Sequence, residues 1–323
     1  MPASLDLRPV DAVDVTLVVD NSVDILMANQ EGVTRFALAV DWAEREQLVA
    51  EHGFSALVTI WVDGAPASLL YDGGVSAGGL IHNLDVMGID PGSLRAFVIS
   101  HGHVDHHGGL EGMFRRRRPG RLPLLIHPGA WRERRVVFPT GHEIRVPPPS
   151  RRDLEAEGLE VIEERGPTLL IDGRFLVSGQ IERTTDFETG FPIHQAREAG
   201  GEWEPDPLIL DDQSLIVRVR DRGLVIVSGC SHSGAVNVLR HAVRLTGESR
   251  IAGFVGGFHL TGTVFEPLIE PTVAAFAASG VERVVPGHCT GWRAMHALAR
   301  TLPDAFVQPS VGSVFRFGAT TAG

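Results

Sequence analysis

The sequence contains no lysine and only two cysteines, Cys230 and Cys289. Two cysteines cannot build the disulfide framework on which small secreted domains depend. No stretch approaches the roughly 18 consecutive apolar residues of a membrane-spanning helix, and the first residues lack the basic and apolar pattern of a signal peptide. We therefore expect a cytoplasmic protein that does not bind membranes.

Positive charge is also scarce. The chain has 29 basic residues, all of them arginine, against 40 acidic ones, and its net charge at pH 7 is −11. A protein that binds nucleic acid without sequence preference normally presents a basic surface to the phosphates, so this class of partner is not expected. The run Arg115–Arg118 is the one basic cluster, and we interpret it as a solvated helix end.

The remaining composition is that of a large globular protein. A chain of 323 residues that is 43% hydrophobic can bury a continuous core. The 37 glycines and 20 prolines predict many loops, but they follow no period and form no low-complexity tract. We expect a single domain that spans residues 1–323.

Short apolar runs rich in β-branched residues alternate with amphipathic patterns along most of the chain. Strands are predicted at residues 13–20, 54–62, 67–72, 94–100, 121–128, 213–229 (a hairpin), 250–257, 282–288 and 311–317. Helices are predicted at residues 76–89, 106–118, 235–247, 271–281 and 291–302. This alternation indicates an α/β fold with sheets between helices. The closing strand, 311–317, either completes a sheet or meets a partner, and the sequence leaves the oligomeric state open.

The middle of the chain differs from both halves. Residues 129–206 are rich in Arg, Glu, Pro and Gly, with strands expected only at 159–164 and 174–179. We interpret this segment as a loop-rich insert that carries substrate-shaping loops, because long irregular connections on a rigid scaffold commonly determine specificity.

The stretch VISHGHVDHHGGL, residues 98–110, concentrates metal-binding side chains. In an extended segment, side chains at i and i+2 point the same way, so His101 and His103 leave the predicted strand as a pair able to hold one cation. Asp105 and His106 start the next helix and suit a second cation, while His107 is expected to point away. Neutral imidazole and carboxylate are ligands for zinc, iron and manganese.

The HxHxDH pattern between a strand and a helix resembles the metallo-β-lactamase superfamily. The resemblance implies an αβ/βα sandwich, in which two mixed sheets are flanked by helices and the metals lie at one edge between the sheets. It also implies that Asp72, in LLYDGG, orients a ligand histidine, although an Asp before Gly is also a common turn former. It further implies that His288, in VVPGHCTG, binds the second metal.

Seven strings between residues 51 and 291 resemble one subfamily more closely. It is the subfamily named for dihydropterin–ribofuranosylaminobenzene phosphate synthase, whose bacterial members are often described simply as metal-dependent hydrolases. The strings are EHGFSALV, HNLDVMGID, ISHGHVDHHGGL, DDQSLIV, GCSHSG, GGFHL and GHCTG.

The sequence departs from the wider superfamily in two places. Where a third histidine for the first metal normally precedes the hairpin, it has Asp211 and Asp212. Where a bridging aspartate normally follows the next strand, it has Cys230. We prefer His232 as the missing ligand, with His259 as the competitor. Cys230 is either a thiolate ligand, which would favour zinc, or a small buried residue, and Asp211 is either a ligand or an orienting carboxylate.

The remaining histidines carry weaker signals. His52, His82 and His127 match the subfamily strings and either line the pocket or have structural roles. Four more are interpreted as ordinary surface or core residues: His142, His194, His241 and His296.

These residues predict an enzyme with two divalent ions, most simply zinc, with manganese or iron as alternatives. A bound metal lowers the pKa of water to roughly 7, so a metal-bound hydroxide is available at neutral pH, and Asp105 is expected to orient it or accept a proton. We expect hydrolysis of an ester, lactone, amide or phosphoester of a small molecule. The resemblance implies one alternative, a dihydropterin diphosphate-dependent transferase, and a non-catalytic metal-binding or ligand-binding protein is the other.

Overall fold

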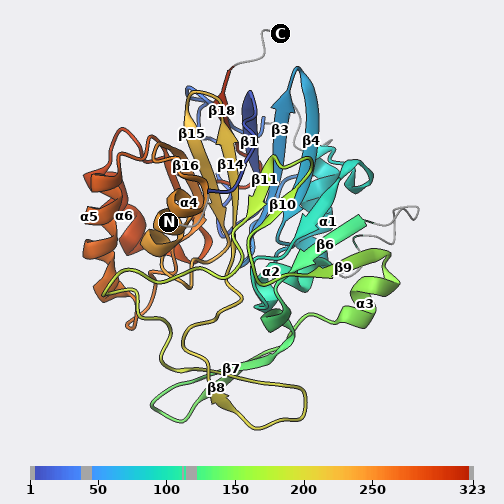
Figure 1. Ribbon diagram of the computed structural model, residues 1–323, viewed down its shortest axis with the longest axis vertical. Coiled ribbons are helices and arrows are strands. Elements are labelled where there is room, and N and C mark those ends of the chain that lie inside the picture. Colours follow the sequence, from blue (N-terminus) through green and yellow to red (C-terminus); the bar gives the residue numbers. More distant parts are fainter. Residues whose placement is uncertain (1–3, 38–45, 111–112, 114–121, 320–323) are drawn as a thin grey trace.

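The computed structural model describes residues 4–37, 46–110, 113 and 122–319 (Figure 1). The run Arg115–Arg118 and most of the second half of the helix expected at 106–118 lie outside these residues. In the described part of the chain, no helix has the length and apolar character that crossing a membrane requires.

The first sheet has eight strands in the order β2-β18-β1-β3-β4-β5-β6-β9. Neighbouring strands are antiparallel from β2 to β4 and parallel from β4 to β9, so the sheet is mixed. β18 pairs with β1 and β2, so the closing strand completes this sheet. In chain order the strands are β1 (Ala12–Val19), β2 (Val33–Thr34), β3 (Ser55–Val62), β4 (Ala65–Tyr71), β5 (Ala96–Val98), β6 (Leu122–Ile126), β9 (Leu159–Glu163) and β18 (Val314–Gly318).

The second sheet has six strands in the order β10-β11-β14-β15-β16-β17 and is also mixed. β14 and β15 form the expected hairpin, and β15, β16 and β17 run parallel to one another. The strands are β10 (Thr168–Leu170), β11 (Phe175–Val177), β14 (Ser214–Val219), β15 (Gly223–Ser228), β16 (Ile251–Gly257) and β17 (Val284–Gly287).

Within the described residues, six α-helices connect or follow these strands: α1 (Ala77–Met87), α2 (Val104–His107), α3 (Arg151–Ala156), α4 (Ala235–Thr246), α5 (Ile269–Ser279) and α6 (Trp292–Thr301). Short 3-10 helices lie at Pro91–Ser93, Gly108–Leu110, Pro128–Trp131, Glu266–Leu268 and His288–Thr290. The first long helix shows why the sequence predicted its ends. The Ser76 hydroxyl accepts from the Gly79 amide at 2.9 Å, and Gly88 ends α1 in the left-handed region at φ 69°.

Three apolar layers hold the fold together. Val15, Val58 and Tyr71 of the first sheet pack against Val217 and Val227 of the second. The outer face of the second sheet packs on α4, α5 and α6, and the outer face of the first packs on α1 and α3. The order helix, sheet, sheet, helix is visible in Figure 1, where α5 and α6 lie on one side and α1 and α3 on the other.

Residues 129–206 are more regular than the sequence indicated. Besides α3, β9, β10 and β11, they contain a third sheet of four antiparallel strands in the order β13-β12-β7-β8. Its strands are β7 (Glu133–Val137), β8 (Glu143–Val146), β12 (His194–Arg197) and β13 (Glu204–Pro205). Their arginine and glutamate residues hid the strand pattern, because the strands gain stability from cross-strand ion pairs such as Arg197–Glu133 rather than from a buried apolar face. The sheet projects below α2 in Figure 1.

Candidate metal centre

The candidate residues gather where several strands end at the same edge of the two sheets. Asp72 follows β4, and His101 and His103 follow β5. In the second sheet, residues after β15, β16 and β17 occupy the corresponding places: Cys230, His232, His259, His288 and Cys289. The carboxyl ends of parallel strands meet at one edge, so side chains distant in sequence converge there.

The loop between β5 and α2 is held close to its neighbours. A Cβ atom at Gly102 would lie 2.2 Å from the carbonyl oxygen of Ala130, so only glycine fits between His101 and His103. The Gly102 amide donates to the Asp211 carboxylate at 2.8 Å, and Arg134 holds the other oxygen of Asp211 at 2.6 Å. This buried ion pair fixes the loop that carries the two histidines.

His101, His103 and His232 form the first donor group. His232 Nε2 lies 3.2 Å from His101 Nε2 and 3.1 Å from His103 Nδ1. Burial lowers the pKa of all three imidazoles well below the ordinary histidine value, so they are neutral. His232 Nε2 carries at most one proton and can donate to only one of its two neighbours. When both neighbours present lone pairs, one of them is therefore left without a proton, and a cation between the nitrogens would take the place of that proton.

Hydrogen bonds to the Nδ1 atoms of His101 and His106 leave the Nε2 atoms of these rings as lone pairs that face the site. The Ser100 hydroxyl donates to Asp72 Oδ2 at 2.7 Å, so it accepts from His101 Nδ1 at 2.9 Å. His106 Nδ1 donates to the same Asp72 oxygen at 2.7 Å. The Nε2 lone pairs of His101 and His106 therefore both face the site.

His194 gives His103 its tautomer. His194 Nδ1 donates to the carbonyl oxygen of Asp206 at 3.0 Å, so its Nε2 accepts from His103 Nε2 at 3.1 Å. His103 Nδ1 is then left as a lone pair toward His232. No local pattern in the sequence marks this role, because His194 lies at the start of β12 in the small third sheet, whose position depends on tertiary packing.

Asp105, His106, Cys230 and His288 form the second donor group. Asp105 Oδ2 lies 3.3 Å from His288 Nε2 and 3.7 Å from His106 Nε2, and His106 Nε2 lies 3.2 Å from Cys230 Sγ. Burial opposes ionisation of Asp105, but His106 and His288 hold the pKa of its carboxyl well below the usual range. Burial also acts against protonation of His106, yet Asp72 and Asp105 raise its pKa, which makes the imidazole a more basic ligand.

The structure separates the weaker candidates. Asp212, next to Asp211, accepts from the Ser233 amide at 2.8 Å, and among the described residues neither aspartate belongs to a donor group. His52, largely exposed, lies 3.6 Å from Asp105 at the mouth of the site. His82 lies in α1, and its Nε2 atom is 2.6 Å from the carbonyl oxygen of Gln47. His127 is buried and accepts from the Gly129 amide at 3.0 Å.

An open groove of about 320 Å³ leads to the second donor group along His288. Asp20 and Asn21, which follow β1, form one wall, and Trp292 and Met295 of α6 form the other. Asp20 accepts from the His288 amide at 3.1 Å, and so the wall also holds a candidate ligand in place. The Trp292 side chain is 63% exposed on the lip of the groove.

Comparison with known proteins agrees with this architecture. Residues 57–236 match the family model described as the metallo-beta-lactamase superfamily. The 7,8-dihydropterin-6-methyl-4-(beta-D-ribofuranosyl)-aminobenzene-5'-phosphate synthase of Methanocaldococcus jannaschii is 28% identical over 294 residues, which cover 89% of this chain and 97% of that protein. An uncharacterised protein of the same organism is 29% identical over 280 residues, 86% of this chain and 98% of that protein.

A solved structure extends the similarity to three dimensions. The crystal structure of Tm1679, a metal-dependent hydrolase of the beta-lactamase superfamily, aligns with a TM-score of 0.70 and 26% identity over 96% of this chain and 100% of that one. The fold class expected from the sequence is thereby confirmed, as is the resemblance to the synthase. The superfamily is enzymatic and binds divalent metals, which agrees with the donor groups at the sheet edge. The chain belongs to the metallo-beta-lactamase superfamily.

Proposed function

We propose that this protein is a metal-dependent hydrolase that acts on an ester, lactone, amide or phosphoester of a small molecule. Two divalent cations would be held by His101, His103 and His232 in the first subsite and by Asp105, His106, Cys230 and His288 in the second. The observation that carries the proposal is the first group, in which three neutral imidazoles converge, with His232 Nε2 3.2 Å from His101 Nε2 and 3.1 Å from His103 Nδ1.

The donor geometry fits a cation. A tetrahedral zinc ion with Zn–N bonds of about 2.05 Å separates its ligands by about 3.4 Å. The nitrogen separations around His232 Nε2, 3.1 and 3.2 Å, are close to that value. The thiol of Cys230 in the second group favours zinc over manganese, because thiolate is a soft ligand. When bound, such cations supply Lewis acidity and lower the pKa of coordinated water to roughly 7.

The chain's own residues support the rest of the reaction. Asp105, kept ionised by its neighbours, is suited to orient a nucleophile or accept its proton. His52 lies 3.6 Å from Asp105 on the solvent side, where proton exchange is possible. The groove along His288 falls at the lower end of the roughly 300–1,000 Å³ typical of small-molecule sites, and the exposed Trp292 ring offers a stacking surface.

A second candidate is a transferase reaction like that of the synthase from Methanocaldococcus jannaschii. The observation in its favour is the length of the similarity, which covers 97% of that protein. The same donor groups serve both reactions, so the difference lies in whether a second organic substrate or water attacks.

Turnover assays separate the two candidates. The zinc-loaded protein is incubated with a panel of lactones, thioesters and phosphodiesters, and in parallel with a dihydropterin diphosphate and an aminobenzene ribofuranoside phosphate. Hydrolysis of at least one panel compound, lost in the His103→Ala variant, is the expected result. Turnover of the dihydropterin pair alone would replace the hydrolase proposal by the transferase, and no turnover by the metal-loaded protein would favour a binding protein.

A further inference from the structure

The only two cysteines of the chain meet beside the second donor group. Cys230 and Cys289 are 59 positions apart, yet their sulfur atoms lie 3.2 Å from each other, and both side chains are buried. The two thiols are free rather than joined in a disulfide. A Cβ atom at Gly257 would lie 2.7 Å from Cys289 Sγ, so the glycine at the end of β16 leaves the space in which the sulfurs approach.

A third donor lies with them. Cys230 follows β15, Cys289 follows β17, and His259 follows β16, the strand between them in the sheet. One donor atom from each of these residues lies within 4.8 Å of the other two. His259 Nδ1 is buried and has no hydrogen-bond partner among the described residues. A buried ring nitrogen without a hydrogen-bond partner costs free energy, which a ligand bound at the ring would offset.

We propose that Cys230, His259 and Cys289 form a third cation subsite, which takes zinc and shares the Cys230 sulfur with the second subsite. Two sulfurs and an imidazole are a donor set that zinc prefers in proteins, whereas manganese and calcium prefer oxygen. Thiolate ligands bring negative charge into a buried place, and a dication at the same point neutralises it.

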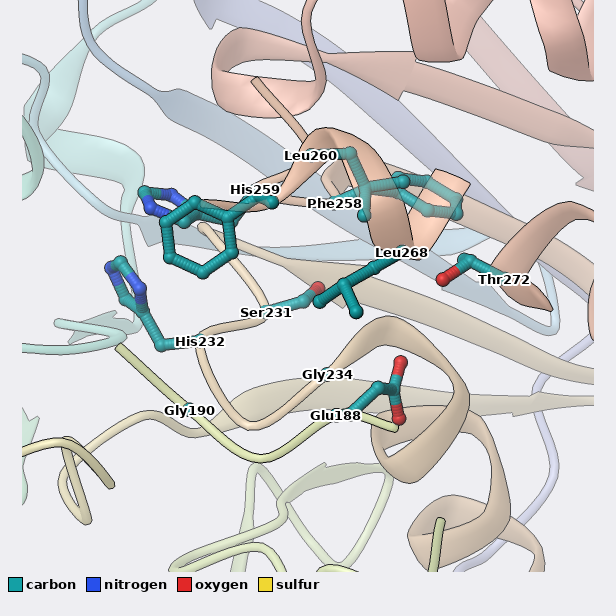
Figure 2. A pocket seen from close by; sticks show the side chains of 11 residues that line it. Glu188, Gly190, Ser231, His232, Gly234, Phe258, His259, Leu260, Leu268 and Thr272 are labelled. Carbon is teal, nitrogen blue, oxygen red and sulfur yellow. The ribbon is translucent and has the colours of Figure 1, made fainter. Parts of the chain in front are cut away.

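The neighbouring cavity leaves room for a further ligand. Figure 2 shows the imidazoles of His259 and His232 at one end of a narrow cavity, with Glu188 and Thr272 at the other. The two rings have centroids 4.2 Å apart. The cavity has space for about one water molecule beside the ring of His259.

Neither a thiol–thiol hydrogen bond nor a disulfide accounts for the whole geometry around the cysteine pair. The thiol–thiol hydrogen bond fits the 3.2 Å contact but does not include the imidazole of His259, the third member of the donor group. A disulfide needs an S–S bond of about 2.05 Å, and the sulfurs are not bonded. The proposal goes beyond the hydrolase function, because it holds whichever reaction the first two subsites support.

Zinc content and zinc–sulfur bonding test the proposal without an activity assay. The reduced full-length chain is loaded with zinc, freed of excess metal and analysed by elemental analysis and X-ray absorption. Wild type is expected to hold three zinc ions per chain with about one sulfur ligand per zinc on average. Cys289→Ser and His259→Ala are expected to lose one equivalent, and Cys289→Ser should fall to about one sulfur per two zinc ions. His142→Ala, which removes an exposed histidine outside the donor groups, should keep all three.

Two results would overturn the third subsite. One is a wild-type protein with two zinc ions, about one sulfur per two zinc ions and unchanged values in Cys289→Ser. The other is a count of no free thiols when the purified protein is unfolded without reductant, because the pair would then be a disulfide. Circular dichroism shows whether each variant is folded, and if Cys289→Ser is not, the wild-type zinc content and sulfur ratio decide alone.

Discussion

Asp72→Asn replaces a single buried oxygen by an NH₂ group and should weaken cation binding at both the first and the second subsite. The Asp72 carboxylate is fully buried and accepts three hydrogen bonds: the Ser100 amide at 2.6 Å, the Ser100 hydroxyl at 2.7 Å and His106 Nδ1 at 2.7 Å. If the side-chain oxygen of the asparagine still accepts from the Ser100 amide, its NH₂ group points at the Ser100 hydroxyl and at His106 Nδ1. His106 Nδ1 must then accept, which moves the ring proton to Nε2 and blocks the lone pair that faces Cys230.

The same change reaches the first subsite through Ser100. Once its hydroxyl has lost the Asp72 acceptor, it is free to donate to His101 Nδ1, and the His101 proton moves to Nε2 as well. Loss of such an orienting contact typically lowers metal affinity about 10–100-fold. We therefore expect a loss of about 1.4–2.7 kcal/mol for the cation of each subsite.

The assay is competition for zinc against a chromophoric chelator, which yields the affinity of each equivalent. Asp14→Asn is the matched control, since this partly buried carboxylate of β1 bonds Trp61 and Arg316 away from the donor groups, and zinc affinity should not change. Wild-type affinity at both the first and the second subsite in Asp72→Asn would refute the tautomer argument. Wild-type affinity at the first subsite together with weakening at the second would refute the relay through Ser100.

Further predictions follow from the same geometry. His103→Ala should remove the cation of the first subsite and the activity together, and full metal occupancy by elemental analysis would contradict its assignment as a ligand. His194→Ala should weaken that cation alone, about 10–100-fold by chelator competition, because His103 loses its acceptor. Phe254→Ala should lower the free energy of unfolding by about 3–5 kcal/mol in urea without changing zinc content, since the ring is buried against the α5 residue Phe276. In the metal-free protein, burial places the folded-state pKa of His101 below its unfolded value of about 6.5, so below that pH only the unfolded state gains a proton and stability falls. Each such histidine costs up to about 1.4 kcal/mol per pH unit, whereas Asp20 and Asp212, whose pKa values burial raises to about 6, act in the opposite direction. Because His103 and His232 add to the effect of His101, the urea midpoint should fall from pH 6.5 to 5.5, and a midpoint that rises would contradict this.

Most of the secondary structure was predictable because its signals are local. Ser76 and Gly88 mark the ends of α1, and the alternation of strand and helix patterns indicated the α/β class. The third sheet was missed because its strands carry charged residues on both faces, and the pairs that stabilise them, such as Arg197–Glu133, join positions distant in sequence. Periodicity within one segment carries no information about such partners.

The sequence alone determined the candidates in the segment from His101 to His106, because one strand end, one tight glycine turn and one helix start fix their relative directions. Tertiary structure alone decided which distant residues join them. It brought His232 rather than Asp211 to the first group, assigned His194 to the outer side of His103 and set the two cysteines in contact. The physical reason is that these residues stand on different strands and sheets, and only the packing of the two sheets on each other determines the distances between their ends.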